Sequence, residues 1–504
     1  MRHGMPDRRG AIKAAIGTLV CPACAATESV AAASTPAPSR QIPTYGERAA
    51  SDYQSSLKDF GGRLECDRDA LAEEYDVVVI GSGYGGSVLA ARLAAAMKNP
   101  ARLCILERGS EWLPGSFPDS MPGFLANRGS GQGSALFAES TFRDLHILHG
   151  YGLGGTSLIN LNVGEIPPPD IFETADWPWE CRGFQCFEPF YELARTCLQP
   201  SANLQRQSAA ATYLQQAAAV SHFDHRKAMI TVRCDDFDGP VMNSAGMLQR
   251  SCIRCGDCAT GCNVGAKNTL AYNYLPLARR HGAQIFCGML ADRISLTDRG
   301  CYEVGVRSLP LGSPKTVQDL VGHQPYRTIR ARCVVVGAGV TGSLQLLLNS
   351  ARHGLPAPPA LGQRFHTNGD IFCVAELPHE MKTSTSEEFL LGTAPGQLSS
   401  ADFGPGPGIE SLASLRNPGC RMMIQDLRVP HALGPLFQLL AGSTHRHAYW
   451  LGMFDDPARC AASVRRDGTL AINTKGLRTT RQYTAAVSMM RRLATATGAS
   501  PLLS

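Results

Sequence analysis

The pattern of apolar and polar positions is clearest in the first quarter of the chain. Residues Tyr75–Ile80 form an apolar, largely β-branched run, which predicts a strand buried on both faces. The glycine-rich segment Gly81–Gly86 follows directly, and Ser87–Met97, rich in alanine and leucine, predicts a helix. A second apolar run, Arg102–Leu106, predicts a strand that leads into Glu107. Strand, glycines, helix, strand and acid in this order predict a dinucleotide-binding unit.

Each part of this unit has a physical role. Gly81 permits the tight turn, Gly83 lets the backbone approach a pyrophosphate, and Gly86 lets the helix pack close to the strand. Glu107 stands where a carboxylate can accept hydrogen bonds from ribose hydroxyls. The glycine pattern alone would also fit a plain turn, but the full order of elements favours the nucleotide site.

A second glycine-rich stretch, His149–Asn160, ends in small hydroxyl and amide residues. The backbone at Gly154 and Gly155 carries no Cβ, so it can lie against a flat ring system, with Ser157 and Asn160 following it. An ordinary surface loop is the alternative interpretation of this stretch taken alone.

Together these segments resemble the glucose–methanol–choline (GMC) family of FAD oxidoreductases, in which the second loop runs beside the isoalloxazine ring. Residues 162–177, 265–275, 333–342 and 361–370 are similar to the branch that contains cholesterol oxidase, and the resemblance covers about residues 74–497. It implies an α/β fold, with a doubly wound, Rossmann-like FAD-binding domain and an interleaved antiparallel-sheet (α+β) substrate domain. It also implies that FAD is bound by Gly81, Gly83, Gly86, Glu107, Gly154, Gly155, Ser157, Asn160 and Gly339.

The late strand and turn at residues 333–342 admit a second interpretation. The glycines between Gly337 and Gly342 could mark a second nucleotide site, as in enzymes that also bind NADPH. No acidic or basic residue that would read a ribose follows at the expected distance. The resemblance implies instead that this segment returns to the FAD domain near the adenine half, and we therefore expect a single FAD.

The resemblance and the linker compositions divide the chain into five parts. These parts are an export signal and linker (1–40), an N-terminal extension (41–73), a discontinuous FAD-binding domain (74–365), a substrate domain (366–478) and a C-terminal helix (479–504). The FAD-binding domain contains a cysteine-rich insert at residues 252–262.

Four of the 18 cysteines in the chain lie in this insert with the spacing C-x2-C-x2-C-x3-C: Cys252, Cys255, Cys258 and Cys262. The spacing is that of bacterial ferredoxins and predicts ligands for an iron–sulfur cluster. However, Asn263 stands where such runs usually have proline, and one run normally gives three ligands to one cluster. A zinc site, local disulfides and buried thiols are the alternatives, and the other cysteines cannot be paired from the sequence.

The sequence does not assign a catalytic residue. The resemblance places a catalytic histidine in a His-Pro run near the C-terminus, and we expect the chain to stop before this segment because its last histidine is His447. His431, His445 and His447 are candidates, although a lone histidine is more often structural. Glu410 loosely resembles an active-site glutamate of some cholesterol oxidases, and Gln425 stands where many relatives carry glutamate.

Charge and hydropathy exclude some partners. The net charge of +5 is small against 48 basic and 43 acidic side chains, so binding to nucleic acid is not supported. No segment reaches the ~18–20 apolar residues of a membrane span. Arg8 and Arg9, followed by the apolar run Ala14–Cys21, resemble a twin-arginine export signal and predict a periplasmic or secreted protein. A basic N-terminus without function, on a cytoplasmic protein, is the alternative.

The resemblance implies an FAD-dependent oxidoreductase that transfers a hydride from the CH–OH group of an alcohol, above all a sterol, to flavin N5. Oxygen or another electron acceptor would be the second substrate. Two alternatives stay open. One is an FAD/iron–sulfur dehydrogenase that passes electrons to a protein or a quinone, and the other is a truncated FAD-binding remnant without catalysis. The fold and motifs do not choose the substrate.

Overall fold

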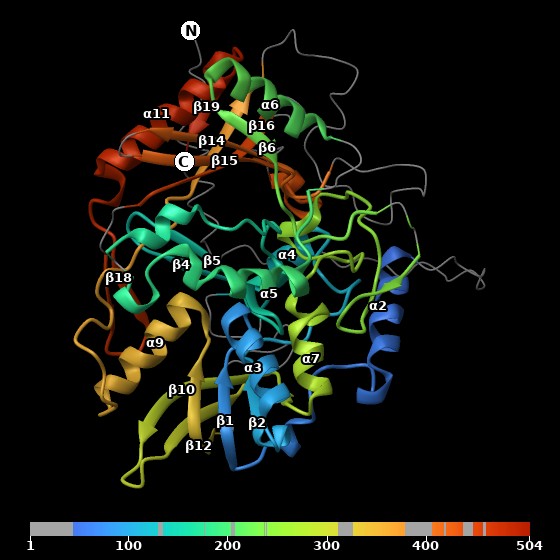
Figure 1. The fold of residues 1–504 in the computed structure, drawn as a ribbon, viewed down its shortest axis with the longest axis vertical. Helices are drawn as coiled ribbons and strands as arrows, with labels where there is room; N and C mark the ends of the chain where they lie inside the picture. The colour runs from blue at the N-terminus through green and yellow to red at the C-terminus, as the bar shows by residue number, and fades with distance from the viewer. Residues whose placement is uncertain are drawn as a thin grey trace, which may run out of the picture.

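The computed structural model describes residues 44–503, apart from residues 130–134, 176, 203–206, 236, 238, 311–325, 378–405, 418–419, 437–446 and 457–459. The predicted export signal and linker therefore lie outside the described residues. The described chain forms two large sheets at opposite ends of the molecule, with loops and short elements between them (Figure 1). No helix in this part of the chain combines the length and the apolar character that a bilayer crossing requires.

The α-helices of the described residues are α2 (Tyr45–Ser56), α3 (Tyr84–Ala96), α4 (Met121–Ala126), α5 (Glu188–Leu198), α6 (Ala209–Ser221), α7 (Tyr274–Arg280), α9 (Gly339–Arg352) and α11 (Arg481–Ala496). Short strands outside the two large sheets are β3 (Arg128–Gly129), β4 (Phe137–Thr141), β5 (His146–Gly150), β7 (Val241–Met242), β8 (Leu248–Gln249), β17 (Ala461–Val464) and β18 (Leu470–Asn473).

The first sheet carries the predicted nucleotide-binding unit. Its strands, in spatial order, are β10 (Met289–Leu296), β11 (Tyr302–Ser308), β12 (Tyr326–Val336), β1 (Glu74–Ile80), β2 (Leu103–Leu106) and β9 (Gln284–Phe286). Strands β12, β1, β2 and β9 run parallel, and β10 and β11 extend the sheet as an antiparallel hairpin. The parallel order with α3 between β1 and β2 confirms the predicted Rossmann-like class.

Side chains of β1 alternate between two apolar cores, which explains the unbroken apolar pattern of this strand. Val77 and Val79 pack with residues of α3 and α7. Val78 and Ile80 point to the other face, where β10, β11 and Leu346 of α9 pack. A strand covered on both faces has no position for a polar side chain in its centre.

The second sheet is antiparallel throughout, as predicted for the substrate domain. Its strands, in spatial order, are β19 (Ser500–Leu503), β13 (Ile371–Glu376), β16 (His447–Phe454), β15 (Cys420–Leu427), β14 (Ser411–Asn417) and β6 (Asp224–Lys227). Helices α6 and α11 pack against this sheet around the buried Trp450, whose ring stacks on that of Tyr213 at 5.6 Å between centroids.

The second sheet draws residues from outside the predicted substrate domain, 366–478. Strand β6 and helix α6 lie within the range predicted for the FAD-binding domain, yet β6 pairs with β14 from Asp224–Ser414 to Lys227–Ser411. At the other edge, β19 pairs with β13, so residues of the predicted C-terminal part complete the same sheet. Backbone pairing between distant segments decides which residues belong to this sheet. The composition of the linkers carries no information about that pairing.

The N-terminal extension is anchored to the first sheet's domain by a buried carboxylate. Glu111 Oε1 accepts hydrogen bonds from Tyr53 Oη and Leu64 N, both at 2.9 Å, and Oε2 accepts one from Glu65 N at 3.1 Å. Burial raises the pKa of Glu111. Tyr53 and Leu64 also belong to the core formed by α3 and α7, so this extension is part of the domain rather than an appendage.

Candidate cofactor site

The first glycine loop joins β1 to α3 and leaves open space on its outer side. Gly81 has a φ of +93°, and a Cβ there would lie 2.5 Å from the Gly337 carbonyl oxygen. A Cβ on Gly86 would lie 2.0 Å from the Gly81 carbonyl oxygen, so packing requires both glycines. A Cβ on Gly83, in contrast, would meet nothing within 4 Å. Gly83 begins α3 without a side-chain cap, and such a helix end suits a phosphate.

Glu107 lies beside this loop at the end of β2, with 5% of its surface exposed. Its Oε2 accepts hydrogen bonds from Ser82 N at 3.1 Å and Ser82 Oγ at 2.5 Å, and its Oε1 accepts one from Gly109 N at 2.8 Å. Ser82 Oγ also accepts from Gly154 N at 2.9 Å. The carboxylate is therefore fixed at the point where both glycine loops meet, and its role toward a ribose stays a prediction.

The second glycine loop follows β5 and touches the first. Gly154 and Gly155 have φ values of +111° and +57°, and a Cβ on Gly155 would lie 2.9 Å from Gly83 Cα. Ser157 is buried and turns inward, because its Oγ donates to Gly154 O at 2.7 Å and accepts from Leu270 N at 3.2 Å. The hydroxyl predicted to contact the cofactor thus holds the loop itself together.

Asn160 links the second loop to the start of α3. Its Nδ2 donates to Tyr84 Oη at 3.0 Å, so the two side chains meet beside Gly83. Asn160 Oδ1 is buried and has no hydrogen-bond partner among the described residues. An orphaned acceptor at this point is what a bound polar ligand would satisfy.

The third glycine segment follows β12 and reaches the same place. Gly337 packs on Gly86, since a Cβ on Gly337 would lie 2.9 Å from Gly86 Cα. Gly339 begins α9 with a φ of +70°, and a Cβ there would meet nothing within 4 Å. Thr341 Oγ1 lies 3.4 Å from Nε2 of His149 on β5. Strands β12 and β1 are neighbours, so their loops converge at one edge of the sheet.

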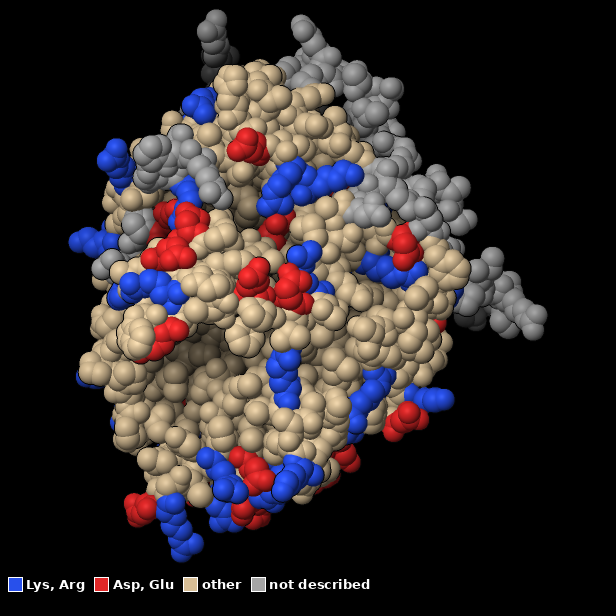
Figure 2. All heavy atoms as spheres, in the orientation of Figure 1, with Lys and Arg blue, Asp and Glu red and all other residues tan. Residues whose placement is uncertain are grey.

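The surface is hollowed where these loops converge. Figure 2 shows a depression in the area that lies between α3 and α9 in Figure 1, with few charged side chains around it. The structure therefore brings together seven predicted cofactor residues: Gly81, Gly83, Gly86, Glu107, Gly154, Gly155 and Gly339. The open positions at the two helix starts fit a dinucleotide whose phosphates approach the backbone.

A buried lysine connects the second glycine loop to the cysteine-rich insert. Lys267 is 2% exposed, and its Nζ donates to Leu158 O at 3.0 Å, Asn160 O at 2.6 Å and Cys258 O at 3.1 Å. Burial lowers the pKa of Lys267 to about 8. In the sequence, Lys267 lies in the segment 265–275 that resembles the cholesterol oxidase branch, and no pattern marks it as buried.

The cysteine-rich insert does not have the geometry predicted for iron–sulfur ligands. Among the described residues, which include all of 252–262, no group of three or more His, Cys, Asp or Glu side chains is arranged to hold a metal ion. Cys258 Sγ accepts a hydrogen bond from Gly408 N at 3.3 Å, and burial raises the pKa of Cys258 to about 12. Burial also raises the pKa of Cys255 well above its ordinary value. The described residues therefore do not support the assignment of Cys252, Cys255, Cys258 and Cys262 as cluster ligands.

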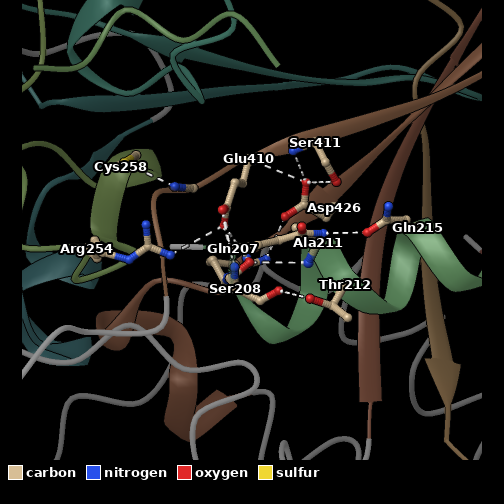
Figure 3. A network of polar contacts seen from close by, with 12 residues as sticks. Gln207, Ser208, Ala211, Thr212, Gln215, Arg254, Cys258, Glu410, Ser411 and Asp426 are labelled. Carbon is tan, nitrogen blue, oxygen red and sulfur yellow. Dashed lines mark hydrogen bonds and ion pairs between the residues drawn. The ribbon is translucent and has the colours of Figure 1, made fainter. Parts of the chain in front are cut away.

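Glu410 belongs to a buried network of charges (Figure 3). Its Oε2 lies 3.6 Å from both Arg254 Nη2 and Arg428 Nη2, and its carboxylate accepts from Ser208 N at 3.1 Å. Asp426 Oδ2 lies 2.9 Å from Arg428 Nη1, and its Oδ1 accepts from the backbone N–H of Glu410 at 3.1 Å. Two carboxylates thus face two guanidinium groups, which is the arrangement of a structural ion network.

The other polar residues considered in the sequence lie on the second sheet or in the segment that follows β15. His431 donates its backbone N–H to Asp257 Oδ1 at 2.6 Å. His447 is buried on β16, and Gln425 is buried on β15 with its Nε2 3.3 Å from Met453 Sδ. His445 lies outside the described residues. No catalytic base is assigned among them.

Comparison with known proteins relates the chain to one family. The family model for the GMC oxidoreductases matches residues 243–369. A cholesterol oxidase of Mycobacterium tuberculosis (strain ATCC 25618 / H37Rv) is 30% identical over 319 residues, which are 60% of this chain and 52% of that protein. A cholesterol oxidase of Acinetobacter baumannii is 28% identical over 318 residues, which are 59% of this chain and 54% of that protein. The chain spans about half the length of these curated relatives.

A solved structure described as a new fungal aryl-alcohol oxidase superposes with a TM-score of 0.50, covering 86% of this chain and 85% of that one. At 13% identity this likeness concerns the fold alone. It agrees with the Rossmann-like sheet and the separate antiparallel sheet. The family match over residues 243–369 and the two cholesterol oxidase relatives thus show that the chain is similar to the GMC oxidoreductases.

Proposed function

We propose that the protein is an FAD-dependent oxidoreductase that oxidises the CH–OH group of an alcohol, with a sterol as the preferred substrate class. The convergence of three glycine segments on one open edge of the parallel sheet carries the FAD part of the proposal. The sterol part rests on the two relatives described as cholesterol oxidases. Dioxygen is the proposed electron acceptor, for the same reason.

The chain's own residues would hold the cofactor at its polar parts. The uncapped start of α3 at Gly83 would take the pyrophosphate, and Glu107 would accept hydrogen bonds from the ribose. The loop at Gly154 and Gly155 and the unpartnered Asn160 Oδ1 would border the ring system. FAD, when bound, supplies the acceptor for the hydride that leaves the alcohol carbon.

Glu410 is a poor candidate for the base that removes the hydroxyl proton. A general base must reach the proton that it abstracts, and its carboxylate must be able to accept it. Glu410 is 1% exposed, and its carboxylate is occupied by Arg254, Arg428 and the backbone N–H of Ser208, so a substrate hydroxyl cannot reach it in this arrangement. The proposal therefore gives Glu410 a structural role and leaves the base unassigned.

The absorbance spectrum of the purified protein tests the FAD proposal. We expect flavin bands, and anaerobic addition of cholesterol or a long-chain primary alcohol should bleach them if the substrate class is correct. Bleaching by the alcohol but not by cholesterol would overturn the sterol assignment while keeping the oxidoreductase. A folded protein without flavin, even after incubation with FAD, would contradict the proposal as a whole.

A variant at Gly83 tests whether the loops described here hold the cofactor. Gly83→Val places its side chain in space that the protein does not fill, and the residue has an ordinary φ of −66°, so the fold should tolerate it. We expect at least a tenfold loss of bound FAD, with an unchanged far-UV circular dichroism spectrum. Leu296→Ala, at an exposed position of β10, is the matched control and should retain FAD.

A further inference from the structure

Two cysteines that the sequence does not pair lie in contact in the structure. Cys252 begins the cysteine-rich insert, and Cys234 precedes it by one short hairpin, formed by β7 and β8. Both side chains are partly buried in the same small apolar cluster, next to Val232 and Val264. The Cys252 thiol is within hydrogen-bonding contact of the Cys234 thiol.

Backbone contacts hold the two segments together on either side of this pair. Cys252 N donates to Arg233 O at 2.8 Å. Ser251 Oγ accepts from Asp235 N at 3.0 Å and donates to Asp235 O at 2.5 Å. The two cysteines therefore stand on adjacent chain segments that are hydrogen-bonded to each other, which keeps their side chains close together.

We propose that Cys234 and Cys252 are a disulfide-forming pair, a modification site that closes the hairpin segment 235–251. The proposal is independent of FAD and of the oxidoreductase activity.

A low-molecular-weight disulfide such as glutathione disulfide would serve as the oxidant. The Cys234 thiolate attacks one sulfur of the oxidant, whose S–S bond breaks and releases one glutathione thiolate. The Cys252 thiolate then attacks the Cys234 sulfur of the mixed disulfide and releases the second glutathione. The protein loses two electrons and two protons, and the oxidant takes up both to give two thiols. The Cys234 thiol and burial together raise the pKa of Cys252, so Cys252 forms a thiolate less readily. We therefore assign the first attack to Cys234.

The bond would stabilise the segment that leads into the insert. Leu248 N donates to Ser56 Oγ of α2 at 2.8 Å, so the hairpin is tied to the N-terminal extension on one side. On the other side, Arg254 lies two residues after Cys252 and pairs with Glu410 (Figure 3). A covalent link between residues 234 and 252 would fix this connection between the two halves of the molecule.

Trypsin separates the two cysteines onto different peptides, which makes the proposal directly testable. Cleavage after Arg233, Arg250 and Arg254 gives peptide 234–250, which contains only Cys234, and peptide 251–254, which contains only Cys252. After equilibration of the full chain with glutathione disulfide and blocking with N-ethylmaleimide, we expect these two peptides to remain linked, with a mass about 2 Da below their sum. Reduction should release both peptides.

Two results would overturn the proposal. One is the recovery of both peptides singly, with blocked thiols, at every ratio of glutathione disulfide to glutathione. The other is a link from peptide 251–254 to peptide 255–267, which carries the remaining three cysteines of the insert.

Cys234→Ser should leave Cys252 open to the blocking reagent, whereas Cys301→Ser, at another partly exposed cysteine, should leave the link intact. The oxidised protein should also unfold at a higher temperature than the reduced one, and Cys234→Ser should abolish this difference.

Discussion

Single buried cations connect parts of this protein that are far apart in the sequence. Lys267 satisfies the carbonyl groups of Leu158, Asn160 and Cys258, and so ties the second glycine loop to the cysteine-rich insert. An ammonium group has three N–H bonds, one for each carbonyl, and no other side chain of that size offers three donors from one atom. Lys267 therefore positions the loop that would border the cofactor.

Replacement of Lys267 by methionine should destabilise the protein. Methionine fills a similar volume but leaves three buried carbonyl groups without their donor, and we expect the free energy of unfolding to fall by roughly 2–4 kcal/mol. Chemical denaturation would measure this loss. Lys475→Met, at an exposed position, is the control and should change stability by less than about 0.5 kcal/mol. Equal stability of the two variants would contradict the role given to Lys267.

The same lysine predicts a pH dependence of stability. Burial lowers its pKa from 10.5 to about 8 in the folded protein, so between these values the unfolded chain binds the proton that the folded chain has released. Stability then rises with pH across this window, and the cost of the buried charge is fully present below about pH 8. The stability of the wild type relative to Lys267→Met should increase from pH 8 to pH 10. A flat difference between the two proteins would argue against the lowered pKa.

Arg428 should contribute more to the free energy of unfolding than an arginine in an exposed ion pair does. It is fully buried against Asp426 and Glu410, and its removal would leave two carboxylates with one guanidinium between them. We expect Arg428→Met to lower the free energy of unfolding by about 3–5 kcal/mol, or to prevent folding. Arg307→Met breaks an exposed pair with Asp292 and should cost at most about 1 kcal/mol. Thermal denaturation of both variants and the wild type would measure the two losses of stability.

At the level of elements, local patterns predicted some segments and could not predict others. Strand β1, helix α3 and strand β2 follow from adjacent residues alone, because burial on both faces and the glycine turn leave clear signals. Strand β6 is Asp224-His225-Arg226-Lys227, an edge strand without apolar alternation, and its partner β14 lies far along the chain. Polar residues are common on edge strands, so β6 can be recognised as a strand only from its pairing with β14. Arg428 and Lys267 escaped prediction because each also has a remote partner, Ser208 for Arg428 and Leu158 for Lys267.

The two glycines at the start of α3 should respond in opposite ways to alanine. At Gly86 the new Cβ would overlap the Gly81 carbonyl oxygen, which would separate the helix from β1. At Gly85 the Cβ would meet nothing within 4 Å, and alanine favours the helix. We expect Gly86→Ala to lower the melting temperature by several degrees or to abolish soluble expression. Gly85→Ala should be neutral or should stabilise by up to about 1 kcal/mol. Calorimetry of both variants without added FAD distinguishes packing from cofactor binding.

At the scale of the whole molecule, the two sheets are joined by polar contacts as well as by apolar packing. The second glycine loop and the insert meet at Lys267, and the insert meets the antiparallel sheet at Arg254 and Glu410. The family resemblance gave the two-sheet architecture in advance, but these connections depend on tertiary contacts that no single segment encodes.

The N-terminal extension should detach when its buried anchor is removed. Glu111→Ala deletes the acceptor for Tyr53 Oη and for the backbone N–H groups of Leu64 and Glu65, and leaves these donors buried without a partner. Helix α2, with its contact to Leu248 of the β7–β8 hairpin, lies at the edge of the domain. Loss of the Glu111 carboxylate should therefore open the segment 44–66 locally before the first sheet unfolds. Brief trypsin treatment should then cut the variant at Lys58 at least tenfold faster than it cuts the wild type, and a large resistant fragment should remain. Glu47→Ala removes only the exposed capping contact with Thr44 and should stay resistant. Uniform degradation of Glu111→Ala, without the large fragment, would show that the extension and the sheet unfold as one unit.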